Sequence, residues 1–529
     1  MGRKPGSRLG KDATDPAGTD LDQGCRMPLQ EPDCHHSPST HSAGAVYPAT
    51  SRPVIIIVGG GFSGTMVAAQ LLRGAQARGV EPPRLVLVER RGTLGEGAAY
   101  GTTSSAHLLN VAAGGMSALP DDSNHFVRWA QRRDPRVTQS SFLPRSMYGE
   151  YLRALLLEAE AAVAPDLRLA RIEDEAVDLE ELTDHRRLRV HLRDRAPIDC
   201  DTVVLATGNL PPACPPLLGD SLAESPVYVR DPWRSLPLDV EPQEPVLLIG
   251  TGLTMLDYAV ALDEQGHRGT ITGISRHGLS PRAHVVRGLD RLNRAELARS
   301  CLRVAGLQRR PGTTLSLLRV VRAAIDRGGR RGLGWRDVVA GMRGCTPELW
   351  ASLDVAERAR FLRHLRPYWE TFRHQVAPET AERFAAMCAS GRAVVLAGRI
   401  QSYRTKGSCV EVVARRRGSR ERVTVRAARV VNCTGPDARI DQIDHILLRA
   451  LVERGLLRSD PLGLGVDVGE CYGAIRRDGS ECERLLVVGP LTRARFWEST
   501  AVPELRVHAA GAAGLILRRM LPLGSAVAA

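Results

Sequence analysis

The chain has 529 residues, of which 43% are hydrophobic, and it carries a formal net charge of +13. This length allows two domains, or one domain with a large insertion, together with a tail. The basic residues are scattered and match no helix-turn-helix or interleaved basic-aromatic pattern, which argues against nucleic acid as a partner and favours attraction of anionic cofactors and substrates.

Residues 1–52 are rich in Gly, Pro, Ser, Asp and His and lack the hydrophobic run of a signal peptide, so we expect a disordered leader. No apolar stretch approaches the roughly 20 residues that span a bilayer. We therefore expect a cytoplasmic protein that contacts no membrane. No two of the 11 cysteines form a C-x-x-C pair, which indicates no zinc site and argues against a disulfide reductase.

Two strand–turn–helix–strand units follow one another along the chain. The first begins at Val54–Val58, a continuous apolar run typical of a strand buried on both faces, and returns at Leu85–Val88, which ends in Glu89. The second begins at Val246–Ile249 and returns at Thr270–Ile274. Each pair of strands flanks a glycine turn and an apolar helix, which predicts two βαβ units.

The first turn contains a G-x-G-x-x-G motif in the setting that dinucleotide binding requires. We expect Gly59 to make the tight turn, Gly61 to let a pyrophosphate approach the helix N-terminus, and Gly64 to bring the helix close to the strand. Glu89 would hydrogen-bond the ribose hydroxyls of the adenosine half. The residues of the turn expected to contact the cofactor are Gly59, Gly61, Phe62, Ser63 and Gly64.

The second turn is an imperfect copy. Met255 stands where a third small residue is usual, so we expect the helix to lie further from its strand. Arg276 follows the next strand, where the first unit has an acidic residue; arginine would pair with a ribose 2′-phosphate, which favours NADPH over NADH, unless Arg276 is a solvated surface charge. The residues of this turn expected to contact the nicotinamide cofactor are Gly250, Gly252, Leu253 and Thr254.

A weak internal repeat supports two related domains. After each βαβ unit, a short apolar strand ends in a Thr-Gly turn, at Thr207-Gly208 in the first copy and Thr434-Gly435 in the second. Small residues at such turns let the chain pass close to a bound dinucleotide. The pattern predicts an α/β fold with two Rossmann-like dinucleotide-binding domains, the second inserted into the first.

A resemblance to a known family rests on several stretches outside the helical segment of residues 285–392. These stretches are Val58–Gly64, Tyr100–Pro120, Pro144–Leu152, Val204–Asn209, Leu248–Asp257 and Gly489–Leu505. On them the chain resembles the flavoproteins with two dinucleotide-binding domains that include flavin monooxygenases. More narrowly, it resembles a bacterial FAD/NAD(P)-binding family that contains FAD-dependent urate hydroxylase and an aspartate N-oxygenase.

The resemblance implies FAD on the first unit and a nicotinamide cofactor on the second. With it, the expected domain bounds are a leader at 1–52, FAD-binding parts at 53–240 and 437–529, NAD(P)-binding parts at 241–284 and 393–436, and a helical insertion at 285–392. The resemblance also implies several contacts with FAD: Asn110 and His107 as polar candidates, Arg145 near the cofactor, and Glu498, Thr500 and Val502 in a loop facing the isoalloxazine ring. His107 is equally compatible with a structural role.

The helical insertion offers candidate substrate contacts at Trp369, Arg373 and His374, whose helical spacing is at least as compatible with plain packing. No residue is expected to be catalytic by itself, because the cofactor carries the difficult chemistry. The resemblance implies that NADPH reduces FAD and that the reduced flavin and molecular oxygen hydroxylate a small, nitrogen-containing or otherwise nucleophilic substrate. Two alternatives stay open: a flavin reductase or dehydrogenase that inserts no oxygen, and a non-catalytic FAD/NAD(P)-binding protein.

Overall fold

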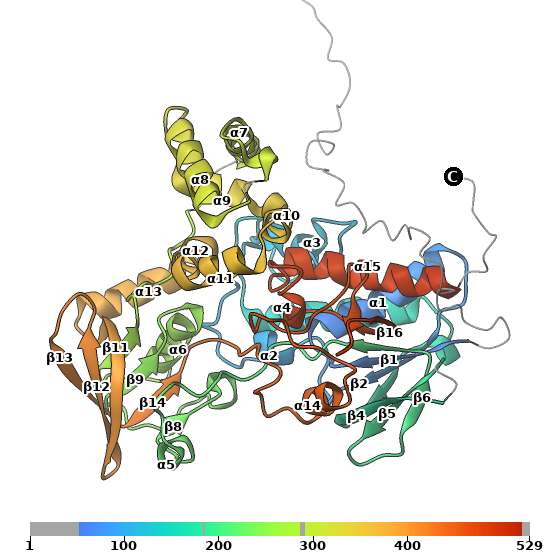
Figure 1. Cartoon of the computed structure of the whole chain (residues 1–529), viewed down its shortest axis with the longest axis horizontal. Coiled ribbons are helices and arrows are strands. Elements are labelled where there is room, and N and C mark those ends of the chain that lie inside the picture. Colours follow the sequence, from blue (N-terminus) through green and yellow to red (C-terminus); the bar gives the residue numbers. More distant parts are fainter. Residues whose placement is uncertain (1–51, 184–185, 286–290, 311, 521–529) are drawn as a thin grey trace, which may run out of the picture.

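The structure is a computed structural model that describes residues 52–183, 186–285, 291–310 and 312–520. The leader expected at residues 1–52 lies outside this range except for Arg52. Two lobes, each built on a sheet, lie side by side, and helices of the expected insertion rise above them (Figure 1). The α/β architecture with two Rossmann-like units agrees with the prediction from the sequence.

The first lobe is built on a six-stranded sheet in the order β15-β16-β7-β1-β2-β3, parallel except for β15. Its central strand has the uninterrupted apolar sequence VIIIV, and Ile55–Ile57 are fully buried because both faces of the sheet are covered. The strands are β1 Val54–Val58, β2 Arg84–Val88, β3 Ala170–Ile172, β7 Thr202–Leu205, β15 Gly473–Ile475 and β16 Glu481–Val487.

One face of this sheet is covered by helices from distant parts of the chain. Helix α1 (Phe62–Ala77) packs against α4 (Arg145–Ala161) and against the C-terminal helix α15 (Val502–Met520), which lies across it in Figure 1. The C-terminal helix therefore belongs to the helical layer of the first lobe. Shorter helices α2 (Gly97–Tyr100) and α3 (His125–Gln131) complete this layer.

The opposite face of the first sheet carries a small antiparallel sheet and one helix. Strands β4 (Ala176–Glu181), β5 (Leu188–Leu192) and β6 (Ile198–Cys200) pair in sequence order, and α14 (Ile446–Glu453) packs on β4. Their buried Leu and Val side chains share one apolar cluster with Ile56 and Val58 of β1.

The second lobe is built on a seven-stranded sheet in the order β13-β12-β11-β10-β9-β14-β8. Strand β8 (Tyr228–Val229) pairs with β14, so the lobe takes a strand from the segment before residue 241, and the expected boundary at 240 is wrong. A two-residue strand is too short to leave a periodic pattern. The others are β9 Val246–Ile249, β10 Ile271–Ser275, β11 Ala393–Lys406, β12 Cys409–Arg416, β13 Arg422–Ala427 and β14 Arg429–Asn432.

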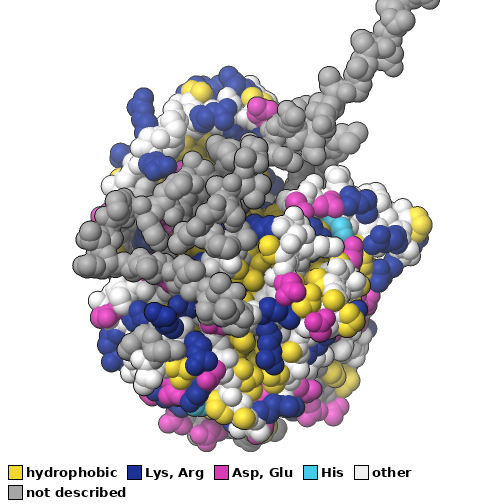
Figure 2. Space-filling view, turned by 90° about the vertical axis from the view of Figure 1, so that its right-hand side faces the viewer, with side chains coloured by type: hydrophobic (Ala, Val, Ile, Leu, Met, Phe, Trp, Pro, Cys, Tyr) yellow, Lys and Arg dark blue, Asp and Glu magenta, His cyan; other side chains and the backbone are white. Residues whose placement is uncertain are grey.

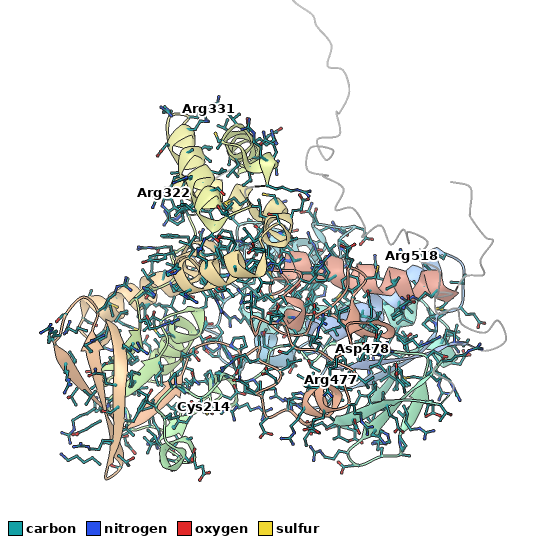
Figure 3. The ribbon with its side chains drawn as sticks, in the orientation of Figure 1. Cys214, Arg322, Arg331, Arg477, Asp478 and Arg518 are labelled. Atoms are coloured by element: carbon teal, nitrogen blue, oxygen red, sulfur yellow. The ribbon has the colours of Figure 1, made fainter. Side chains whose placement is uncertain are left out.

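The described residues of the expected insertion, 291–310 and 312–392, form helices and contain no β-strand. The part carrying the labelled Arg322 and Arg331 projects furthest from the two lobes (Figure 3). The last helix of the segment returns to pack against α6 (Leu253–Glu264) of the second lobe. The helices are α7 Arg291–Val304, α8 Thr314–Gly329, α9 Trp335–Gly341, α10 Thr346–Ala351, α11 Val355–His364, α12 Arg366–Arg373 and α13 Pro378–Ala389.

Candidate functional site

The first glycine turn has the backbone that its motif predicts. Gly59 has a φ of +105°, and a Cβ at this position would overlap the carbonyl oxygen of Ala206 at the end of β7. A Cβ at Gly64 would overlap the carbonyl oxygen of Gly59. Only glycine satisfies both positions, because the helix and two strand ends meet there without room for a side chain.

The N-terminus of α1 fits the pyrophosphate of a dinucleotide. Its N-cap, Gly61, provides no side-chain cap, and the first turn holds no acidic residue, so the first N–H groups of the helix lack an intrahelical acceptor. A Cβ at Gly61 would meet only the Cα of Gly97, at 3.6 Å. Phe62 and Ser63 are buried, so they would offer the ligand their backbone N–H groups.

Glu89 directly follows β2 and lies beside this turn. Its Oε2 accepts a hydrogen bond from the N–H of Gly60 at 2.7 Å, and its Oε1 accepts one from the N–H of Arg91 at 3.1 Å. The carboxylate is thereby held at the tip of the strand, with lone pairs left for the hydroxyls of a ribose. Thr207 and Gly208 follow β7 on the other side of the turn, and Gly208 (φ +72°) has open space where a Cβ would be.

The second turn repeats the first at the level of the backbone. Gly250 has a φ of +107°, and a Cβ there would overlap the carbonyl oxygen of Cys433 at the end of β14. Gly252 is an uncapped N-cap of α6, next to Leu253 and Thr254, and no atom lies within 4 Å of its Cβ position. Gly435 (φ +87°) has equally open space. A dinucleotide fits this turn by the same criteria as the first.

Met255 replaces the third small residue without a gap or overlap. Its side chain is fully buried and lies against Gly273 of β10, where a Cβ would be 3.5 Å from both Cγ and Sδ of the methionine. A glycine on the facing strand therefore makes the space that a glycine on the helix makes in the first turn.

A pocket of about 540 Å³ adjoins the end of β10. Arg276 is exposed there, beside the turn between β12 and β13, and Arg417 contacts His277. Only Arg276 was singled out from the sequence, although three consecutive arginines at 415–417 are a signal for a basic patch. Six of the nine lining residues are arginines: Arg276, Gly398, Arg399, Arg415, Arg416, Arg417, Gly418, Ser419 and Arg420.

This concentration of one charge differs from the face drawn in Figure 2. Over the lower half of that face, Lys and Arg side chains are interspersed with Asp and Glu. In the pocket, Arg416 has an acidic partner in Glu421, at 3.2 Å. The pocket therefore suits an anion with more than one negative charge.

Arg145 joins the two lobes. Its Nη2 forms an ion pair with Oδ2 of Asp257 on α6 at 2.7 Å, and its Nε donates to the carbonyl of Leu108 at 3.0 Å. Both charged side chains are at most 9% exposed. His107 Nε2 lies 3.1 Å from the carbonyl of Asp257, and burial lowers the pKa of His107. Sequence reasoning missed Asp257, which was visible as a carboxylate among the apolar residues of the first two turns of α6.

The three residues expected to face the isoalloxazine ring lie in different environments. Glu498 is 2% exposed and accepts an ion-pair hydrogen bond from Arg373 at 2.8 Å, whereas Thr500 is exposed and Val502 is packed in the core of the first lobe. The Oδ1 of Asn110 is buried without a hydrogen-bond partner, as expected of a polar group that awaits a ligand. The flavin contacts assigned to these residues stay predictions.

The comparisons with known proteins agree with this geometry. Residues 56–210 match the model of a family described as FAD-NAD(P)-binding, which confirms the predicted cofactor classes and the resemblance. The nitrosuccinate-forming L-aspartate N-monooxygenase of Streptomyces davaonensis is 30% identical over 270 residues. The match spans 42% of this chain and 41% of that relative, so the chain covers less than half of the relative's length.

Solved structures of similar fold cover most of the chain. The reduced form of the ornithine hydroxylase of Pseudomonas aeruginosa is 18% identical, with a TM-score of 0.60 over 89% of this chain and 100% of that one. The ornithine N-hydroxylase of Kutzneria sp. 744, solved with reduced FAD, NADP⁺ and L-ornithine, is 14% identical, with a TM-score of 0.57 and the same coverage. These likenesses confirm the predicted fold. Among the described helices, none has the length and apolar character needed to cross a membrane.

Proposed function

We propose, from the FAD-NAD(P)-binding domain at residues 56–210, that this protein is an FAD- and NADPH-dependent monooxygenase that hydroxylates a nitrogen atom of a small molecule. The observation that carries the proposal is the presence of two glycine turns with the same backbone in one chain, each beside a Thr-Gly turn with open space. The aspartate N-monooxygenase relative supports nitrogen as the atom oxidised. Molecular oxygen is the co-substrate, and a cytoplasmic location without nucleic acid or membrane belongs to the same proposal.

FAD would accept a hydride from NADPH and, once reduced, activate oxygen. The protein's own part is to bind and orient. The uncapped starts of α1 and α6 would hold the two pyrophosphates, and Glu89 the ribose of the flavin cofactor. The ion pair between Arg145 and Asp257 would keep the two lobes in the arrangement that brings nicotinamide and flavin together.

The arginine pocket supports NADPH rather than NADH. It adjoins Arg276 at the end of β10, which is the place of the adenosine ribose in a Rossmann unit. A 2′-phosphate carries a double negative charge that several guanidinium groups would bind, whereas the bare hydroxyl of NADH would leave them without an anion.

The test is an anaerobic titration followed by oxygen. NADPH should bleach the flavin absorption of the holoprotein without oxygen; admission of oxygen with L-aspartate and other amines should then give hydroxylated nitrogen in proportion to the NADPH consumed. Hydrogen peroxide as the sole product with every amine would indicate a flavin reductase. A flavin that neither nicotinamide cofactor bleaches would indicate a non-catalytic binding protein.

A further inference from the structure

Three ion pairs connect the helical insertion to the chain between β16 and the first turn of α15: Arg343–Glu504, Arg373–Glu498 and Glu370–Arg493. Arg343 binds Glu504 through two hydrogen bonds, Nε to Oε1 at 2.5 Å and Nη2 to Oε2 at 2.6 Å. This pair is bidentate, so each carboxylate oxygen has a guanidinium donor. Together with the stacking of Trp350 on Trp497, at 4.3 Å between ring centroids, it accounts for the attachment of the insertion at this place.

The second pair is only half complete. Arg373, the last residue of α12, donates one hydrogen bond from Nη2 to Oε2 of Glu498 at 2.8 Å, and the two side chains are 12% and 2% exposed. The Nε of Arg373 and the Oε1 of Glu498 are both buried without a partner, as is the hydroxyl of Ser499. A buried donor and a buried acceptor without partners cost free energy, and a ligand that supplies the complementary groups removes that cost.

The segment that carries Glu498 begins beside the first glycine turn. Glu498 lies in the segment that begins at Gly489, and a Cβ at Gly489 would be 3.0 Å from the hydroxyl of Ser63 in the first turn of α1. The segment thus starts beside the proposed pyrophosphate site and ends at the N-terminus of α15.

We infer that Arg373 and Glu498 bind the substrate, and that this substrate is an amino acid carrying a free carboxylate and an amine. The inference rests on the proposed function. The carboxylate would accept from Nε of Arg373, and the amine would donate to Oε1 of Glu498, so that one molecule satisfies both groups. A diamine would leave the arginine without an anion, and a simple dicarboxylic acid would leave the glutamate without a donor.

The charges around the pair favour a substrate with a net negative charge. The guanidinium groups of Arg343, Arg373 and Arg506 interact with the carboxylates of Glu498 and Glu504, which leaves one positive charge in excess. The Nε of Arg506 is buried without a partner. An acidic amino acid would balance this excess, whereas lysine or ornithine would add to it.

Calorimetric titration of the oxidised holoprotein tests the inference with four probes: L-aspartate, L-lysine, succinate and cadaverine. We expect L-aspartate to bind at least about tenfold more tightly than each of the others, because succinate and cadaverine each lose one charge-assisted hydrogen bond and L-lysine adds a positive charge. Equal binding of L-aspartate and succinate, or of L-aspartate and cadaverine, would overturn the inference.

The variants remove the pair as a unit. Arg373→Met alone leaves a buried carboxylate unpaired, so the double variant Arg373→Met/Glu498→Gln, which removes both charges, is made beside it. We expect both variants to bind L-aspartate about 10- to 100-fold more weakly than the parent. In Arg373→Met, which changes no residue expected to contact FAD, flavin content and the rate of anaerobic flavin reduction by NADPH should stay within about twofold of the parent. Arg322→Met, on the exposed face of α8 away from the lobes, is the matched control and should change nothing.

Two outcomes distinguish failure of this inference from failure of the proposed function. If Arg373→Met keeps the affinity for L-aspartate, or loses flavin as strongly as it loses L-aspartate, the pair is not the substrate site. If L-aspartate binds through the pair and no hydroxylated nitrogen forms with any probe, the inference stands and the monooxygenase proposal fails.

Discussion

The two glycine turns solve the same steric problem with glycines in different places. In the first, Gly64 sits on the helix, directly against the carbonyl of Gly59. In the second, Met255 occupies the helix position and Gly273 on β10 receives its side chain. A missing motif glycine therefore does not by itself indicate a degenerate site. Either the helix or the strand can supply the small residue that the helix–strand contact needs.

The adenosine ends of the two units differ in charge rather than in backbone. Glu89 closes the first unit and is held by backbone N–H groups of its own turn. Arg276 closes the second and stands in a pocket of arginines. A carboxylate selects ribose hydroxyls and an arginine cluster selects a phosphate, so the two units are expected to take different dinucleotides.

Valine in place of each N-cap glycine should have the largest effect and should separate the two sites. Gly61→Val would put a branched side chain at the proposed site of the flavin pyrophosphate, so we expect a correctly folded but colourless protein. Gly252→Val should keep the flavin and abolish its anaerobic reduction by NADPH. Absorbance spectra and circular dichroism of the two purified variants check this, and a yellow Gly61→Val protein would contradict the first assignment.

Because Met255 packs against Gly273, the effects of substituting the two residues on the free energy of unfolding should not be additive. Gly273→Val would crowd Sδ of the methionine and lower the free energy of unfolding by about 1–3 kcal/mol. Adding Met255→Ala should restore part of that loss, although the alanine alone removes buried volume and costs about 2–5 kcal/mol. Denaturant unfolding of both single variants and the double variant measures the coupling, and simple additivity would show that the two residues do not share this space.

Arg276→Ala should distinguish the two nicotinamide cofactors. We expect the KM for NADPH to rise about 10- to 100-fold through loss of one charge-assisted hydrogen bond of about 1.5–3 kcal/mol. The KM for NADH should change less than about twofold, because it has no 2′-phosphate. Initial rates of flavin reduction with both cofactors provide the measurement, with Arg322→Ala as control. Equal effects on both cofactors would count against a contact between Arg276 and the 2′-phosphate.

The smallest change is expected at the other adenosine end. Glu89→Ala removes the acceptor for ribose hydroxyls and for the N–H of Gly60, so we expect FAD to bind about tenfold more weakly. Glu89→Gln keeps one acceptor oxygen, so its affinity for FAD should lie between those of Glu89→Ala and the parent. Fluorescence titration of the apoprotein with FAD provides the constants, and an unchanged constant for the alanine variant would remove Glu89 from the site.

The sequence by itself determined the βαβ units and their turns. Strands β1 and β9 begin and end at the residues expected from the apolar runs, because buried strands impose a local pattern. The left-handed glycines Gly59 and Gly250 are also local requirements, since no other residue adopts that backbone so easily.

Which charged residues form ion pairs depends on how distant segments pack, and could not be predicted from the sequence pattern. Arg145 and Asp257 lie 112 positions apart, and Arg373 and Glu498 lie 125 apart. No local pattern records such pairs, because an arginine that will be buried against a distant carboxylate looks the same in sequence as one that stays in solvent. Strand β8, with two residues, exists as a strand because β14 offers it a free edge. Packing, not periodicity, selects such features.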